Sequence, residues 1–326
     1  MLVASPGTDG VALKLSQFFR YAAALGNGRG QIWMPSTAQL GTDSPWQALL
    51  QEGQVVARPH PQPALLLISD AADWLAADQF YGPGRSIPRL QLLWGSSLCC
   101  WGHGALQGPA VRVALGRSVA QSLAASGLLR ELIHTLPLGL DPNDLPPLVK
   151  ERRVGEVLIL AATQPTLGLT LQQSLRRRGL RCRCELSPWP IKQQQQALAE
   201  AEVAVVLAPA RGAPSLGLRR LAAMALQTPL VCEARDPDDA LCRDGHNALV
   251  RPGEAEALAQ AAADLLAAGG PRLRRKLIDG GLATLVRHRR ALEQLEFGQL
   301  LGRLPQLWQE ARSCHPEKTQ LMMPLQ

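Results

Sequence analysis

Residues 215–253 decide the fold, and they read SLGLRRLAAMALQTPLVCEARDPDDALCRDGHNALVRPG. A glycine turn around Gly217 precedes an Ala/Leu/Met-rich segment, 219–226, that predicts a helix. Two short apolar segments, 230–232 and 248–250, predict strands, with a loop and an acidic helical turn between them. Strand, helix and strand separated by short turns are typical of a parallel sheet with crossover helices. The expected fold class is therefore α/β.

The start of the predicted helix suggests an anion site. Gly217 leaves backbone N–H groups free to face an anion, and the helix dipole favours a phosphate there. Arg219 and Arg220 lie in the first turn, where the same dipole disfavours cations. They are either solvated or present because an anionic partner binds beside them.

The stretch also resembles the C-terminal half of GT-B glycosyltransferases, in particular the retaining family 4 (group 1). The residues that carry the resemblance are Gly217-Leu218, Leu221, Ala223-Met224-Ala225, Thr228-Pro229-Leu230-Val231, Asp244-Gly245, Asn247, Leu249-Val250 and Pro252-Gly253. The resemblance implies two Rossmann-like domains whose parallel sheets face a central cleft. It also implies a metal-independent transfer of a sugar from a nucleotide-diphosphate sugar, with retention and without a further cofactor. The diphosphate would lie at Gly217, Leu218, Arg219 and Arg220.

Two departures from the family pattern leave the activity open. The family carries two glutamates that bracket the donor sugar and the ribose, and their positions here hold Pro214 and Ala222. The family also places an Arg and a Lys after the first strand of this domain, whereas residues 162–168 carry no charge. The chain is therefore either a glycosyltransferase or a catalytically degenerate GT-B protein that acts as a binding or scaffold partner.

The whole chain is consistent with this organisation. Its 326 residues suffice for two domains. We expect an acceptor-side domain at 1–141, a linker at 142–153, a nucleotide-sugar domain at 154–290, a helix packing back at 291–312, and a tail at 313–326. Pro137, Gly139 and Asp141 match the segment that leads into the linker in the family.

Several local predictions can be checked individually. Asp70 is expected to cap a helix that follows a buried strand. Residues 163–168 are expected to form a loop, and 169–178 a helix. A helix at 193–201 would place its glutamines on the outer face. Residues 272–290 and 291–312 are each expected to form one helix.

Composition limits the partners and the location. The chain is 46% hydrophobic and 19% charged, which indicates a globular protein, and it shows neither a membrane-spanning run nor a signal peptide. Seven cysteines without a C-x-x-C pair indicate free thiols in a reducing cytosol and no zinc site. Cys232 reads as a buried small hydrophobe.

The net charge of +7 comes mostly from clustered arginines. Solvated helix faces explain such clusters, and an anionic membrane surface or a diphosphate ligand are alternatives. Aromatic residues make up 4% of the chain and form no RNA-binding signature, so nucleic acid is disfavoured. The expected partners are a nucleotide sugar and a glycan, lipid or small-molecule acceptor, with a peripheral membrane contact as a further alternative.

The catalytic residues are not identified by the sequence. His103 is a candidate for orienting acceptor or donor, against the alternative of an exposed loop histidine. Gly7 and Gly10 form a G-x-x-G turn after the first strand, which is expected to face the cleft. No metal-binding or catalytic-triad motif is present. A dehydrogenase would need a full G-x-G-x-x-G, which the sequence lacks.

Overall fold

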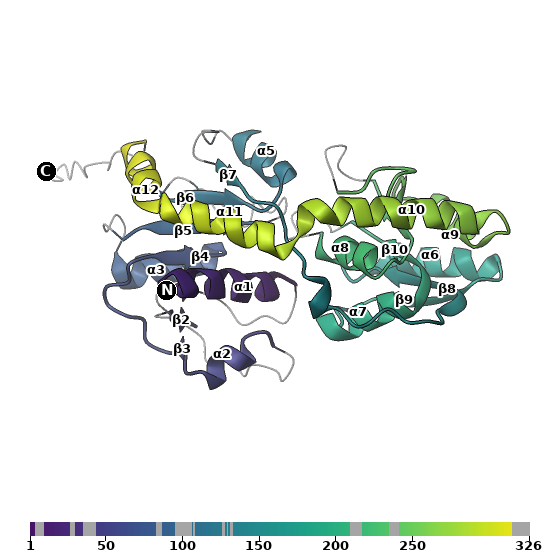
Figure 1. The fold of residues 1–326 in the computed structure, drawn as a ribbon, viewed down its shortest axis with the longest axis horizontal. Helices are drawn as coiled ribbons and strands as arrows, with labels where there is room; N and C mark the ends of the chain where they lie inside the picture. Colours follow the sequence, from purple (N-terminus) through teal and green to yellow (C-terminus); the bar gives the residue numbers. More distant parts are fainter. Residues whose placement is uncertain are drawn as a thin grey trace, which may run out of the picture.

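The computed structural model describes residues 1–3, 10–26, 30–34, 44–82, 87–94, 106, 108–125, 128, 130, 133–208, 217–234 and 241–314. Two α/β units lie side by side along the long axis of the molecule (Figure 1). The chain crosses between them twice. The second crossing is made by the helices α10 (Gly270–Leu285) and α11 (Arg290–Gly302), as Figure 1 shows.

The N-terminal unit is built on a seven-stranded sheet with the order β3-β2-β1-β4-β5-β6-β7. Every neighbouring pair is parallel. Its strands are β1 (Leu2–Val3), β2 (Ile32–Trp33), β3 (Val55–Val56), β4 (Leu66–Ile68), β5 (Arg89–Leu93), β6 (Val111–Ala114) and β7 (Ile133–Thr135).

The helices of this unit are α1 (Gly10–Leu25), α2 (Gln47–Gln51), α3 (Ala71–Tyr81) and α5 (Arg117–Ala125). Asp70 caps α3 as predicted, because its side chain accepts a 2.7 Å hydrogen bond from the backbone N–H of Asp73. One large apolar core joins α1 to the sheet and includes residues from near the C-terminus, such as Phe297 and Trp308.

The C-terminal unit is a five-stranded parallel sheet with the order β12-β11-β10-β8-β9. Its strands are β8 (Arg153–Leu160), β9 (Arg181–Glu185), β10 (Ala201–Val206), β11 (Leu230–Glu233) and β12 (Leu249–Arg251). Its helices are α6 (Pro165–Arg177), α7 (Ile191–Glu200), α8 (Leu218–Ala225), α9 (Ala255–Leu266) and α10 (Gly270–Leu285). Separate apolar cores cover the two faces of this sheet, as the near-continuous apolar run of β8 requires.

The predicted start of α6 is wrong. The helix begins at Pro165, so residues 165–168 are helical and not part of a loop. Proline is compatible with the first helical turn because its missing N–H has no partner there in any case. Close packing requires glycine at position 168, since a Cβ there would lie 2.3 Å from the Ala161 Cβ.

The C-terminal helices also differ from the prediction. Residues 291–312 do not form one helix: α11 (Arg290–Gly302) and α12 (Leu304–Ser313) meet at Arg303, with Pro305 in the first turn of α12. Helix α10 ends at Leu285 and a 3₁₀ turn (Val286–His288) follows. Helix α11 packs on α1, where the rings of Phe297 and Phe18 lie 4.8 Å apart.

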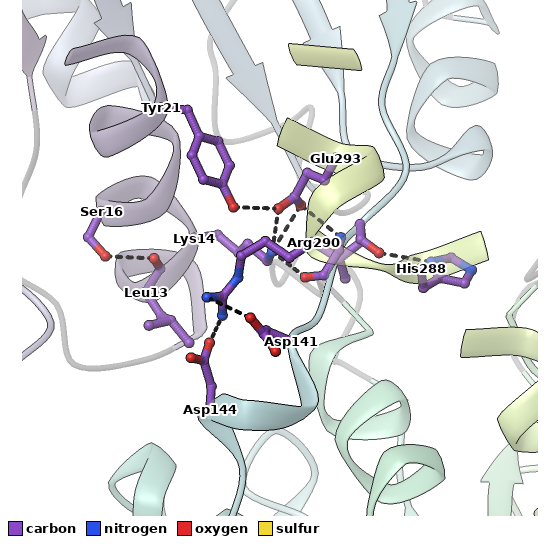
Figure 2. A network of polar contacts seen from close by, with 11 residues as sticks. Leu13, Lys14, Ser16, Tyr21, Asp141, Asp144, His288, Arg290 and Glu293 are labelled. Carbon is purple, nitrogen blue, oxygen red and sulfur yellow. Dashed lines mark hydrogen bonds and ion pairs between the residues drawn. The ribbon is translucent and has the colours of Figure 1, made fainter. Parts of the chain in front are cut away.

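A buried polar network joins the two crossings (Figure 2). The Lys14 ammonium on α1 donates to both carboxylate oxygens of Glu293 on α11, at 2.9 and 2.7 Å, and to the Gly139 carbonyl. The Glu293 carboxylate also accepts from the Gly139 N–H at 2.8 Å. The side chains of Lys14 and Glu293 are 1% and 0% exposed.

Backbone hydrogen bonds align the same two crossings. Leu140 donates to the His288 carbonyl at 2.8 Å, and Arg290 donates to the Leu140 carbonyl at 3.1 Å. Gly139 is needed at this point because a Cβ there would lie 2.8 Å from the Arg290 Cα. The two parallel sheets confirm the predicted fold class, while the domain boundaries remain predictions.

Candidate functional site

The candidate site is the start of α8, at the carboxyl edge of the C-terminal sheet. Gly217 precedes the helix in the left-handed conformation, with φ of 64°. Among the residues that the structure describes, no side chain caps this helix start. Within the described ranges, the first turn therefore presents backbone N–H groups and the positive end of a helix dipole, and Gly217 offers them no side-chain acceptor.

An ion pair links the first turn of α8 to the end of β9, the edge strand of the sheet. The Arg219 guanidinium lies 3.6 Å from Oε1 of Glu185, the last residue of β9. Glu185 is fully buried, whereas the Arg219 side chain is 30% exposed. Arg219 is thus held at the helix start and still reaches solvent.

Glu185 is satisfied by further contacts from one loop and one helix. It accepts hydrogen bonds from the Trp189 N–H at 2.9 Å and from the Gln194 side chain at 2.9 and 3.0 Å. Burial raises the pKa of Glu185, against the opposing effects of Arg219 and these hydrogen bonds. The prediction that the glutamine run faces outward is wrong in part, because Gln194 and Gln195 are buried.

Arg220 differs from its neighbour. Its residue is only 7% exposed, so it lies on the inner side of α8. The hydrogen bond with Cys242, together with the Arg220 charge, lowers the pKa of the Cys232 thiol despite burial. The pKa of the Cys242 thiol is raised by its hydrogen bond with Cys232 and by burial, and the Arg220 charge only opposes that rise. The two arginines that the sequence groups together therefore face different surroundings.

A second carboxylate lies at the same edge of the sheet. Glu233, the last residue of β11, is buried and accepts a 2.8 Å hydrogen bond from the Ala208 N–H. Its carboxylate also accepts from the Gln164 side chain at 2.5 Å, and Gln164 donates to the Ala208 carbonyl at 2.8 Å. Gln164 thus stands beside a carboxylate in the loop where the resemblance implied basic residues.

Helix α8 also contacts the crossing segment. Leu218 and Leu221 form an apolar cluster with Leu138 and Leu140, which belong to the first crossing between the units. The start of α8 therefore lies at the junction of the two units, beside the segment that leads away from the N-terminal sheet.

Some predicted residues fall outside the described part of the chain. His103, Gly7 and Pro214 are among these, so their predicted roles stay predictions. Gly10 is the first residue of α1, and Ala222 is buried in α8. Within the described ranges, His, Cys, Asp and Glu side chains form no cluster suited to a metal ion. No helix in the described segments has the length and apolar character needed to cross a bilayer.

Glu185, Glu233 and Gln164 were not predicted as site residues from the sequence. The available signal was positional: both glutamates are the last residues of strands, and Gln164 follows the end of another strand. Polar residues directly after the carboxyl ends of parallel strands gather at one edge of the sheet, where ligands bind in open α/β sheets.

Comparisons with known proteins bear on the fold and on the C-terminal unit. Residues 143–268 match the family model described as "Glycosyl transferases group 1". Similar solved structures include HepE from Anabaena in complex with UDP-glucose, with 13% identity, a TM-score of 0.67, and coverage of 92% of this chain and 98% of that one.

Two further solved structures resemble the chain to a similar degree. Sucrose-phosphate synthase from Thermosynechococcus elongatus has 13% identity and a TM-score of 0.68, with coverage of 94% of this chain and 98% of that one. A glycosyltransferase from Rickettsia africae has 13% identity and a TM-score of 0.65, with coverage of 94% and 97%. No curated protein sequence matches the chain. The chain therefore has the GT-B fold, and residues 143–268, which include α8 and its strands, match the group 1 glycosyltransferase model.

Proposed function

We propose that this protein transfers a sugar from a nucleotide-diphosphate donor to an acceptor. The observation that carries the proposal is the start of α8, which has no side-chain cap among the described residues and holds Arg219 in place through the buried Glu185. An anion at a helix start is stabilised by the N–H groups and the dipole, and a charge-assisted hydrogen bond from arginine adds to this. The family match and the UDP-glucose bound to HepE support a nucleotide sugar as the anion.

The chemistry follows from where charge develops. When the sugar leaves, negative charge accumulates on the departing diphosphate, and preorganised donors stabilise it. The N–H groups of residues 217–219 and the Arg219 guanidinium would do this without a metal ion. Retention at the anomeric carbon belongs to the proposal through the resemblance, and it would require the acceptor to approach on the face from which the diphosphate leaves.

The N-terminal unit would supply the acceptor side. Helix α8 packs against Leu138 and Leu140 at the junction of the two units. An acceptor held by the N-terminal unit could therefore reach a donor bound at α8. The acceptor class proposed is a glycan, a lipid or a small molecule. A cytoplasmic location, with peripheral contact to a membrane, is part of the same proposal.

The first test is ligand-induced stabilisation. A ligand that binds only the folded protein raises its unfolding free energy, by about 2.7 kcal/mol at one hundred times its dissociation constant. We expect UDP-glucose, GDP-glucose or ADP-glucose at millimolar concentration to raise the melting temperature, and Arg219→Ala to reduce that rise. Arg177→Ala is the matched control, because Arg177 is exposed in the last turn of α6. If none of the three donors changes the melting temperature, the proposal fails.

A second candidate function is a GT-B protein that binds a partner without catalysing transfer. The acidic character of the carboxyl edge favours it, since Glu185 and Glu233 lie there and residues 162–168 carry no charge. Donor turnover distinguishes the two functions. Release of UDP from UDP-glucose that Arg219→Ala abolishes and Arg177→Ala preserves would rule out the non-catalytic alternative.

A further inference from the structure

Two cysteine sulfurs lie next to each other, one in β11 and one in the segment that follows it along the chain. The Sγ atoms of Cys232 and Cys242 are 3.1 Å apart. A disulfide bond is about 2.05 Å long, so the two sulfurs need to approach by only about 1 Å to form one. The sequence predicts Cys232 to be a small apolar core residue, and its burial agrees, but the nearby Cys242 sulfur gives it a chemical partner.

Strand pairing fixes the position of Cys232, and hydrogen bonds fix the residues beside Cys242. Cys232 lies within β11, paired with Val206 of β10 and Val250 of β12. The residues flanking Cys242 are fixed by Asn247, which donates to the Leu241 carbonyl at 2.8 Å and accepts from the Arg243 N–H at 2.7 Å. Asn247 is in turn bound to Thr284 of α10 at 2.9 Å. The short distance between the sulfurs is therefore built into the fold.

The surroundings favour a reactive thiolate in the pair. The Cys242 thiol donates toward Cys232, and together with the Arg220 charge this holds the pKa of Cys232 below its usual value despite burial. The thiolate is the nucleophile in thiol oxidation. The pair thus combines one sulfur that favours the thiolate with a second sulfur placed to react with the product.

We infer that Cys232 and Cys242 form a redox-modification site that a peroxide converts to an intramolecular disulfide. The Cys232 thiolate attacks one oxygen of hydrogen peroxide, so that an S–O bond forms, the O–O bond breaks, and hydroxide leaves as water after taking a proton. The Cys242 sulfur then attacks the Cys232 sulfur, the S–O bond breaks, and the second water leaves with the Cys242 proton. Two thiols are oxidised, and one peroxide is reduced to two waters.

The position of the pair connects it to the helix start described above. Leu241, next to Cys242, packs close to Gly217, where a Cβ would lie 2.8 Å from the Leu241 Cδ2. A bond between Cys232 and Cys242 ties the chain beside Gly217 to strand β11. If the proposed donor site is correct, oxidation acts on that site.

Peptide mass spectrometry tests the disulfide directly. The folded protein is treated with hydrogen peroxide, denatured, alkylated and digested with trypsin. Cleavage after Arg220, Arg235 and Arg243 places Cys232 in peptide 221–235 and Cys242 in peptide 236–243, each with one cysteine. We expect these two peptides to appear linked, and dithiothreitol to separate them.

The controls separate this site from general thiol oxidation. Cys232→Ser and Cys242→Ser should each abolish the linked peptide, while Cys184→Ser should leave it. Recovery of both peptides alkylated and unlinked, or as sulfinic acids, from the peroxide-treated wild-type protein overturns the inference. The rise in melting temperature that UDP-glucose causes is measured separately for the oxidised and the reduced protein. Failure of the donor proposal would show as no shift in either form, whereas the peptide result would be unaffected.

Discussion

At the scale of single residues, Glu185 illustrates how a neighbour in space changes the role of a side chain. In the sequence it ends a short polar-alternating strand. In the fold it is fully buried, accepts hydrogen bonds from Trp189 and Gln194, and forms an ion pair with Arg219. A buried carboxylate costs free energy unless such partners surround it. Its raised pKa shows that burial outweighs the partners.

This raised pKa predicts a pH dependence. A carboxyl group whose pKa is higher in the folded than in the unfolded protein contributes stability at low pH, and the contribution is lost as pH rises through the folded pKa. Glu185→Gln removes this titration and keeps an acceptor for the Trp189 N–H. We expect the unfolding free energy of Glu185→Gln minus that of the wild type to increase as pH rises above 4.5. Urea denaturation from pH 4 to 8 measures the difference, and a difference that stays constant with pH contradicts the prediction.

At the scale of elements, α10 shows how close packing selects glycine inside a helix. Gly280 lies where α10 meets the turn before β12, and a Cβ there would lie 2.0 Å from the His246 carbonyl oxygen. Helix propensity alone favours alanine over glycine by about 1 kcal/mol. Here the backbone contact decides against alanine, because the carbonyl belongs to a turn that Asn247 fastens to the same helix.

Two glycine-to-alanine changes are expected to differ in their effect on the free energy of unfolding. Gly280→Ala should destabilise the protein by about 1–3 kcal/mol, the range found for overpacking. Gly298→Ala is the matched control, since Gly298 lies inside α11 and the nearest atom to its Cβ would be 3.8 Å away. It should be neutral or stabilising by up to about 1 kcal/mol. Thermal unfolding of both variants measures this, and equal effects would refute the packing argument.

At the scale of the whole molecule, a buried ion pair lies at the junction of the units. Lys14 and Glu293 are far apart in sequence and join α1, the first crossing at Gly139, and α11 (Figure 2). Burial lowers the pKa of Lys14, and the charge of Glu293 opposes this. Such pairs add little net stability compared with apolar residues, but losing one partner leaves an uncompensated buried charge.

This arrangement predicts an asymmetry between single and double variants. Lys14→Met should cost about 3–5 kcal/mol, because the buried Glu293 carboxylate loses its partner. Lys14→Met combined with Glu293→Gln should be more stable than Lys14→Met alone, since no charge remains and the amide oxygen still accepts from Gly139. Arg275→Met tests an exposed pair with Asp279 and should cost at most about 1 kcal/mol. Urea midpoints measure all three, and a double variant less stable than the single one would disprove the argument.

The sequence by itself determined the class of fold and the position of the candidate helix. Apolar strands, glycine turns and the proline after Thr228 are local signals, so α8 and β11 were predicted close to their observed bounds. The same local patterns did not show that Pro165 begins α6 or that residues 291–312 divide at Arg303. Propensity leaves such boundaries open, and packing fixes them.

Only the tertiary structure decided which side chains meet. Arg219 and Arg220 are adjacent in sequence, yet one pairs with Glu185 while the other lies inside near the two thiols. The second crossing of the chain brings Glu293 to Lys14. The packing of β11 and the turn before β12 brings Cys242 to Cys232. The physical reason is that hydrophobic periodicity sets the buried face of each element, whereas contacts between distant residues arise only when those faces pack together.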